Sequence, residues 1–110
     1  MRTLYGGKRA GAGESPRIEV RESRWGRELI IDGTLASFLR PGRLATRSVW
    51  DALAVPLLAL PKRRRNAILL LGLGGGSTAR IVRALAPRAR IVGVEFDAEV
   101  VHVARKFFDI

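Results

Sequence analysis

The sequence predicts an α/β protein in which a small antiparallel β meander precedes a β-α-β-α segment, the opening of a doubly wound parallel sheet. Three observations favour this fold class. Short β-prone runs alternate with turn signals over residues 17–40. Two apolar runs, residues 67–71 and 90–95, each precede a segment with helical periodicity. A cluster of glycines directly follows the first of these runs, where a tight turn has to lead from a strand into a helix.

The composition is that of a small folded protein with a modest core. The chain has 110 residues, of which 47% are hydrophobic and 27% charged, and these fractions are ordinary for a globular domain. The lack of cysteine excludes disulfides and cysteine-based metal sites, and a single histidine, His102, excludes a histidine-rich one. We find no signal peptide and no apolar run long enough to span a membrane, so we expect a cytoplasmic protein without a membrane partner.

The net charge is +10, from 20 Lys and Arg residues against 10 Asp and Glu residues. Such a balance favours anionic partners, including nucleic acid. The basic residues are scattered, however, apart from the run 62–65, and no aromatic residues interleave with that run to stack on bases. We therefore interpret most of the charge as solvated surface and do not expect nucleic acid to be the main partner.

We divide the chain into three segments. Residues 1–16 lack periodicity and are predicted to be a flexible basic arm, residues 17–44 the small β domain, and residues 45–110 the start of a nucleoside-binding domain. Two parallel strands with two helices do not cover both faces of a sheet of this class. We therefore expect the chain to be the front part of a larger domain, truncated after its second βα unit, or to be completed by a partner.

Turn and capping residues support the boundaries of the predicted elements. Asp-Gly at positions 32–33, between two β-prone runs, predicts a tight hairpin. Pro56 interrupts the helical pattern of residues 46–60 and predicts a kink or two short helices. Ser77 or Thr78 is expected to cap the helix that follows the glycines.

The glycine turn and a later acidic residue predict a nucleoside-binding site. Gly72, Gly74, Gly75 and Gly76 let the backbone bend and approach a ligand where a Cβ would clash. The helix that follows offers unpaired N–H groups at its start. Glu95 ends the second apolar run, 23 positions after Gly72, where an acidic side chain is placed to bind ribose hydroxyls. These five residues are our candidate binding residues, and we assign no catalytic or metal-binding residue.

The spacing of the glycines fits two templates. Counted from Gly72 it reads G-x-G-x-G, as in nucleoside-binding turns of methyltransferase-like folds. Counted from Gly74 to Ala79 it reads G-x-G-x-x-A, as in dinucleotide-binding proteins. A phosphate-binding P-loop is excluded because no Gly-Lys-Ser/Thr occurs. A structural alternative stays open. In it, the glycines only allow the strand and the helix to pack closely, and Glu95 is a solvated residue at the end of a strand. We interpret the other residues with functional side chains as structural: Trp25, Asp32, Trp50, Asp97 and His102.

Residues 29–33, the kinked helix, the turn at 68–77 and the segment 92–108 stand in an order that resembles spermidine synthases. The likeness is greatest to the bacterial spermidine synthase-like (polyamine aminopropyltransferase-like) proteins, whose turn often reads Gly-Leu-Gly-Gly-Gly-Ser. The resemblance covers residues 17–110 and corresponds to the N-terminal part of the family's chains only. It implies a small β domain ahead of a Rossmann-like, class I methyltransferase-like fold.

The resemblance implies transfer of an aminopropyl group from decarboxylated S-adenosylmethionine, as co-substrate, to a small amine, without a metal. It also implies that the glycines line the nucleoside, that Glu95 binds the ribose, and that the protein is a homodimer. Some family positions differ. The acidic residue of the family's turn is Gly75 here, and the glutamine after its Asp-Gly turn is Ala36. The tyrosine and histidine of its kinked helix correspond to Val49 and Val55.

The family's catalytic aspartate belongs to a later strand-end motif that we do not find in these 110 residues. An amine acceptor needs such a carboxylate to orient it and take its proton, so we expect this chain alone to be inactive as an aminopropyltransferase. Two other hypotheses remain. One is a methyltransferase-like protein that uses S-adenosylmethionine, and the other is a non-catalytic module that binds nucleic acid through residues 62–65. Dinucleotide binding is a fourth hypothesis, which requires the shifted glycine pattern.

Overall fold

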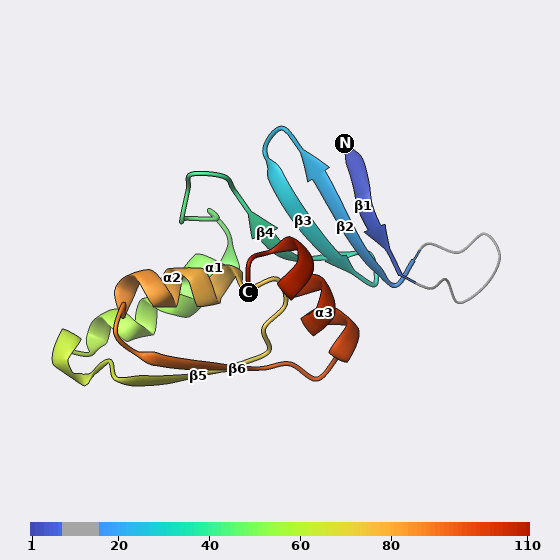
Figure 1. Ribbon diagram of the computed structural model, residues 1–110. Coiled ribbons are helices and arrows are strands. Elements are labelled where there is room, and N and C mark those ends of the chain that lie inside the picture. Colours follow the sequence, from blue (N-terminus) through green and yellow to red (C-terminus); the bar gives the residue numbers. More distant parts are fainter. Residues whose placement is uncertain (8–15) are drawn as a thin grey trace.

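The computed structural model describes residues 1–7 and 16–110 (Figure 1). It contains an antiparallel four-stranded sheet in the order β1-β2-β3-β4 and a parallel pair, β5-β6. The predicted α/β class, with the meander before a β-α-β-α segment, is confirmed. The elements are β1 Arg2–Gly6, β2 Ile18–Ser23, β3 Gly26–Ile31, β4 Thr34–Leu39, α1 Val49–Ala54, η1 Val55–Ala59, η2 Lys62–Arg64, β5 Ala67–Leu71, α2 Ser77–Leu85, β6 Arg90–Val94 and α3 Ala98–Phe107.

The turn between β3 and β4 matches the twist of its strands. The two strands pair up to Ile31 opposite Thr34, so that Asp32 and Gly33 alone form the connection. Both turn residues have positive φ, 48° and 76°, which is the conformation of two-residue turns that join right-twisted strands. The predicted Asp-Gly hairpin is therefore confirmed.

The expectation of a flexible arm over residues 1–16 is wrong for its first part. Arg2–Gly6 form β1, which pairs antiparallel with β2 and places Arg2 opposite Glu22. An edge strand of this kind is decided by pairing with a partner distant in the sequence, and its five residues carry no alternating pattern. Residues 8–15, which the same prediction included, lie outside the described residues. The division of the chain into domains stays a prediction.

The larger buried cluster joins the antiparallel sheet to α3, which lies below that sheet in Figure 1. The apolar stripe of α3 thus packs on the meander. Polar contacts reinforce the junction: Arg17 pairs with Asp97 at 2.7 Å and with Glu99 at 3.1 Å, and the hydroxyl of Tyr5 donates to Glu99 at 2.8 Å. The buried members of the cluster are Ile18, Val20, Leu29, Val100, Val103 and Phe108.

The predicted kinked helix is two helices end to end. α1 ends at Ala54, and the 3₁₀ helix η1 continues it, because Pro56 has no N–H for an α-helical hydrogen bond. The α-helix begins at Val49 and not at residue 46, as the sequence had indicated. Thr46 lies ahead of it, and its N–H and hydroxyl both donate to the carboxylate of Asp51.

The parallel pair is covered on one face. β5 and β6 pair from Ala67 opposite Arg90 to Leu71 opposite Val94, and α2 packs on one side of them. Ile81 and Val82 of α2 are buried there. Across the described ranges, every helix is too short or too polar to cross a lipid bilayer. The other face of the pair exposes the apolar side chains Leu69, Leu71, Val92 and Val94.

Candidate functional site

The glycine turn leads from the end of β5 into α2. The N–H of Gly72 donates to the carbonyl of Val94 at 2.8 Å, which extends the parallel ladder by one residue. Gly72, Gly74 and Gly76 have φ angles of 82°, 54° and 76°, a conformation that residues with a Cβ rarely adopt. The turn therefore requires glycine at these three alternate positions.

The carboxylate of Glu95 holds this turn in place. Its Oε2 accepts the N–H groups of Leu73 and Gly74, each at 3.1 Å, and its Oε1 accepts the N–H of Asp97 at 3.1 Å. Burial alone would raise the pKa of Glu95, but the surrounding backbone N–H groups outweigh burial and place the pKa below its usual range. The side chain is therefore an anion at neutral pH.

Glu95 retains acceptor capacity for a ligand. A carboxylate offers about four lone-pair positions, and the backbone occupies two on Oε2 and one on Oε1. These three hydrogen bonds leave one lone-pair position, on Oε1. A ribose diol would gain a second bond to Glu95 only by displacing Leu73 or Gly74. The sequence predicted a ligand role for this residue, and the structure adds a role in organising the turn.

A pocket of about 280 Å³ opens beside the turn, and Gly72, Gly74 and Glu95 all line it. Glu95 is the one charged residue among those lining the pocket. Most of the remaining wall is apolar and includes Ala36 of β4 and Trp50 of α1. Trp50 had been interpreted as a packing residue, and it also forms part of the candidate site.

Gly75 and Gly76 face the interior and do not line this pocket. A Cβ on Gly75 would lie 2.8 Å from the Cβ of Ser37 and 3.0 Å from Cδ1 of Phe108, and a Cβ on Gly76 would lie 2.1 Å from Cδ1 of Ile110. These two glycines allow the turn to pack closely against β4 and the last residues of the chain. Their ligand role stays a prediction.

Two serines anchor the turn to β4. The Oγ of Ser37 accepts the N–H of Gly75 at 2.7 Å. The Oγ of Ser77 accepts the N–H of Phe38 at 2.9 Å and donates to its carbonyl at 3.2 Å. Both serines are only 1% exposed. The sequence analysis missed both anchors. Nothing in the sequence near Ser37 indicates a contact with the glycine turn, and nothing near Ser77 indicates a contact with β4.

The two helices that follow the parallel strands begin differently. The prediction that Ser77 or Thr78 caps α2 is wrong, because Gly76 is the N-cap and no side chain caps the helix. The hydroxyl of Thr78 instead donates to a carbonyl of α1 at 3.3 Å. Asp97 caps α3 by accepting the N–H of Glu99 at 2.9 Å, in agreement with the structural role that the sequence analysis gave it.

A second cavity, of about 680 Å³, reaches Glu95 from another side of the turn. Arg80, Arg83 and Arg105 line it, together with Asp109. Arg80 is partly committed to the fold, since its Nη1 donates to the carbonyls of Gly75 at 2.9 Å and of Phe108 at 3.0 Å. Arg105 is exposed on α3. The surroundings of Glu95 thus include a pocket with no cation and a cavity with several.

Other residues considered from the sequence lie elsewhere. Trp25 is 62% exposed at the β2–β3 turn, with the guanidinium of Arg24 at 4.6 Å from its ring. His102 is exposed on α3. Val49 and Val55, at family site positions, are exposed and do not line the 280 Å³ pocket. Within the described ranges, no three or more His, Cys, Asp or Glu side chains are grouped so that they would hold a metal ion.

The chain is similar to several longer proteins. It is 40% identical over 58 residues to a probable polyamine aminopropyl transferase of Bifidobacterium longum, covering 53% of this chain and 12% of that protein. It is 35% identical over 88 residues to a polyamine aminopropyltransferase of Saccharolobus islandicus, covering 80% of this chain and 28% of that protein. It is also 35% identical over 63 residues to an eEF1A lysine and N-terminal methyltransferase homolog of Drosophila pseudoobscura pseudoobscura, covering 57% and 9%. No family model matches the chain.

A solved structure supports the same relationship. The crystal structure of a probable spermidine synthase from Corynebacterium glutamicum matches with a TM-score of 0.70 and 26% sequence identity, covering 98% of this chain and 41% of that one. The class of protein is thus an α/β protein with a Rossmann-like methyltransferase fold. The chain spans 12% and 28% of the two aminopropyltransferases that it matches. The chain is therefore similar to one part of the spermidine synthase-like proteins, in agreement with the resemblance found in the sequence.

Proposed function

We propose that this chain forms the nucleoside-binding part of an aminopropyltransferase, with decarboxylated S-adenosylmethionine as co-substrate and a small amine as acceptor. The observation that carries the proposal is the meeting of Gly72, Gly74 and an anionic Glu95 in one pocket. The names of the aminopropyltransferases and of the spermidine synthase that the chain resembles support it.

Each wall of the pocket has a role in this proposal. Oε1 of Glu95 would accept a hydrogen bond from a ribose hydroxyl. Gly72 has no atom within 4 Å of the position a Cβ would take, so its backbone is open to the ligand. Trp50 offers an aromatic surface to the adenine ring. A pocket whose one charge is negative favours a donor that carries an ammonium group and no carboxylate.

The acceptor half of the reaction is not assigned to residues of this pocket. An amine acceptor requires a carboxylate to orient it and to take its proton. Glu95 is the one acidic residue that lines the pocket, and the proposal assigns its remaining acceptor position to the ribose. We therefore expect the 110-residue chain by itself to bind the nucleoside without transferring an aminopropyl group.

Titration calorimetry with methylthioadenosine, an adenosyl thioether, tests the nucleoside site. We expect the wild type to bind and Glu95→Gln to weaken binding about tenfold, since the variant loses a charge-assisted hydrogen bond. Glu28→Gln is the matched control, because Glu28 lies on β3 and does not line the pocket. Equal affinity of Glu95→Gln and wild type, or an equal loss in the Glu28 variant, would contradict the assignment.

A methyltransferase-like protein that uses S-adenosylmethionine is a second candidate. Its support is the cavity on another side of Glu95, where Arg105 lies near enough to line the same space and would pair with the carboxylate of that cofactor. The likeness to a methyltransferase homolog points in the same direction. Comparing the affinities of S-adenosylmethionine and its decarboxylated form separates the two candidates. A preference for the carboxylated form that Arg105→Gln abolishes would favour the methyltransferase.

Two further expectations come from the family resemblance. We propose that the protein is a homodimer and acts in the cytoplasm. Sedimentation velocity on the purified chain tests the first expectation, and imaging of a tagged copy in cells tests the second.

A further inference from the structure

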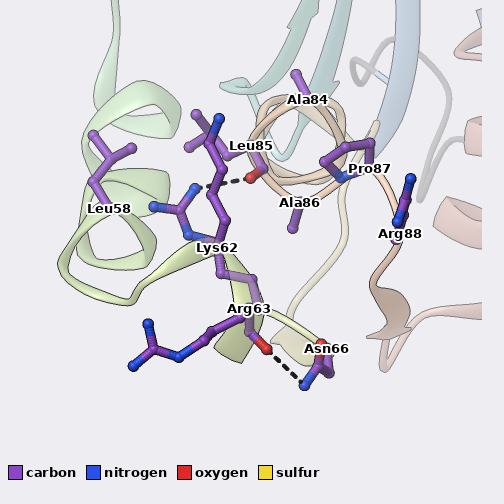
Figure 2. Close-up of a pocket in the computed structure, with 10 residues that line it drawn as sticks. Leu58, Lys62, Arg63, Asn66, Ala84, Leu85, Ala86, Pro87 and Arg88 are labelled. Atoms are coloured by element: carbon purple, nitrogen blue, oxygen red, sulfur yellow. Dashed lines mark hydrogen bonds between the residues drawn. The ribbon is translucent and has the colours of Figure 1, made fainter.

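A third hollow lies at the opposite end of β5 from the glycine turn. It measures about 670 Å³ and lies between the segment 58–66 and the end of α2, as Figure 2 shows. β5 begins at Ala67, beside this hollow, and ends at Leu71, beside the glycine turn. The residues that line this hollow are therefore separate from the proposed nucleoside site.

The hollow is lined by cations without counter-charges. Lys62, Arg63 and Arg65 come from one wall and Arg88 from the other, and none of the residues that line the hollow is acidic. The stretch 52–94, which supplies all of them, contains no Asp or Glu. Like charges held around one space repel each other, and an anion placed among them removes that repulsion.

The arginines of the antiparallel sheet are in a different situation. In the part of the chain that the structure describes, the ion pairs all involve arginines in this sheet or next to it: Arg2 with Glu22, Arg17 with Asp97 and Glu99, Arg21 with Glu19, and Arg27 with Glu22. The fold thus neutralises arginines where acids are at hand. None of these ion pairs includes a cation that lines the hollow.

The cations of the hollow fall into two kinds. Arg65 is structural, because its Nε donates to the carbonyl of Leu60 and its Nη1 to that of Leu85, both at 2.9 Å, and these bonds join the two walls. Lys62 and Arg88 are exposed and come from opposite walls (Figure 2). Two exposed donors from opposite walls, with Arg65 joining those walls, are well placed to bind a group with several anionic oxygens.

We propose that this hollow binds the polyphosphate group of a small organic anion, such as a nucleoside triphosphate. Its volume exceeds the needs of one phosphate, and its several cations match a group that carries more than one charge. Leu58, Ala84 and Leu85 give an apolar wall for the uncharged part of the ligand. No aromatic residue lines the hollow to stack on the bases of a strand, which favours a small anion over single-stranded nucleic acid.

Titration calorimetry of the full chain with tripolyphosphate and with ATP tests this proposal. We expect saturable binding of both at one site, and Lys62→Gln combined with Arg88→Gln should raise Kd about tenfold. The matched control combines Arg24→Gln with Arg43→Gln, which removes the same charge from exposed positions outside the hollow. The control should leave Kd unchanged. Tighter binding of ATP than of tripolyphosphate would identify a nucleotide as the ligand, and equal binding would identify free polyphosphate.

Three results would overturn the proposal. Non-saturable binding would show that the hollow is no site. An equal rise in Kd in both double variants would show that the ligand responds to the net charge of +10 and not to this hollow. A single-stranded RNA that displaces both ligands, with an affinity that falls steeply with salt, would favour a nucleic-acid surface. Circular dichroism confirms that each variant is folded, and amide shifts limited to residues 62–66 and 84–88 would support the proposal independently.

Discussion

Replacing Ser37 by alanine removes the hydroxyl that joins β4 to the glycine turn. Ser37 is 1% exposed, and its Oγ accepts the N–H of Gly75 at 2.7 Å. Gly75 is itself buried, so solvent does not reach its N–H from the surface once the hydroxyl is removed. The variant therefore buries a donor without an acceptor, which costs about 1–3 kcal/mol. A chain of this size loses about 4 °C or more in Tm for each kcal/mol.

Urea unfolding followed by circular dichroism measures this loss. Ser48→Ala is the matched control, because Ser48 is exposed and its side chain makes no capping bond to α1. We expect the control to stay within about 0.5 kcal/mol of the wild type. Hydrogen exchange at the Gly75 amide should speed up in the Ser37 variant alone. Equal stabilities of the two variants, with Gly75 still protected, would refute the reasoning.

Three further outcomes are expected. Glu95→Gln lowers stability, since one amide oxygen replaces a carboxylate that accepts three N–H groups. Because the pKa of Glu95 lies below its ordinary 4.5, this stabilisation is present above pH 4.5 and lost as pH falls through the lower folded value. Wild type and variant should thus converge in acid, and a constant gap in urea midpoint would contradict this. Gly75→Ala should lower the free energy of unfolding by about 1–3 kcal/mol, because the added Cβ overpacks against Ser37. A urea midpoint equal to that of the wild type would show that β4 shifts to accommodate the Cβ and would contradict this prediction. Asp51→Ala removes the acceptor of the Thr46 N–H and hydroxyl and should cost about 1 kcal/mol, measured as a lower Tm than that of Asp51→Asn.

Local signals were sufficient for much of the fold. Asp32 and Gly33 specify their hairpin because few residue pairs tolerate positive φ at both positions. Pro56 marks the change from α-helix to 3₁₀ helix because its missing N–H removes an α-helical hydrogen bond at that position. Asp97 caps α3 through a bond to a residue only two positions away. Each of these features depends on neighbours in the sequence, which is why the sequence reveals it.

Features decided by distant partners were not predictable in this way. β1 exists because it pairs with β2 across the residues 7–17, and its own residues do not alternate. The hydroxyl of Ser77 suits a helix cap, but an unpaired N–H of Phe38 on β4 takes it. Tertiary contacts of this kind override a local preference without leaving a pattern in the sequence.

The residues of the candidate site were likewise predicted only where a local motif indicated them. Gly72, Gly74 and Glu95 were predicted from one motif and its spacing, and the structure brings all three to one pocket. Gly75 and Gly76 belong to the same motif, yet they lie against other elements because the turn is packed on its far side. Trp50 reaches the pocket from α1, and no spacing rule connects a helix residue with a turn that begins more than 20 positions later.

The anchors between β4 and the glycine turn also bear on the order in which the chain folds. The bonds of Ser37 with Gly75 and of Ser77 with Phe38 join residues 38 and 39 positions apart. Contacts across such long loops are closed only after the loop entropy has been lost, so they form late in folding. Weakening them should speed unfolding more than it slows refolding. The turn that carries the candidate site would then be among the last parts of the molecule to assemble and the first to open.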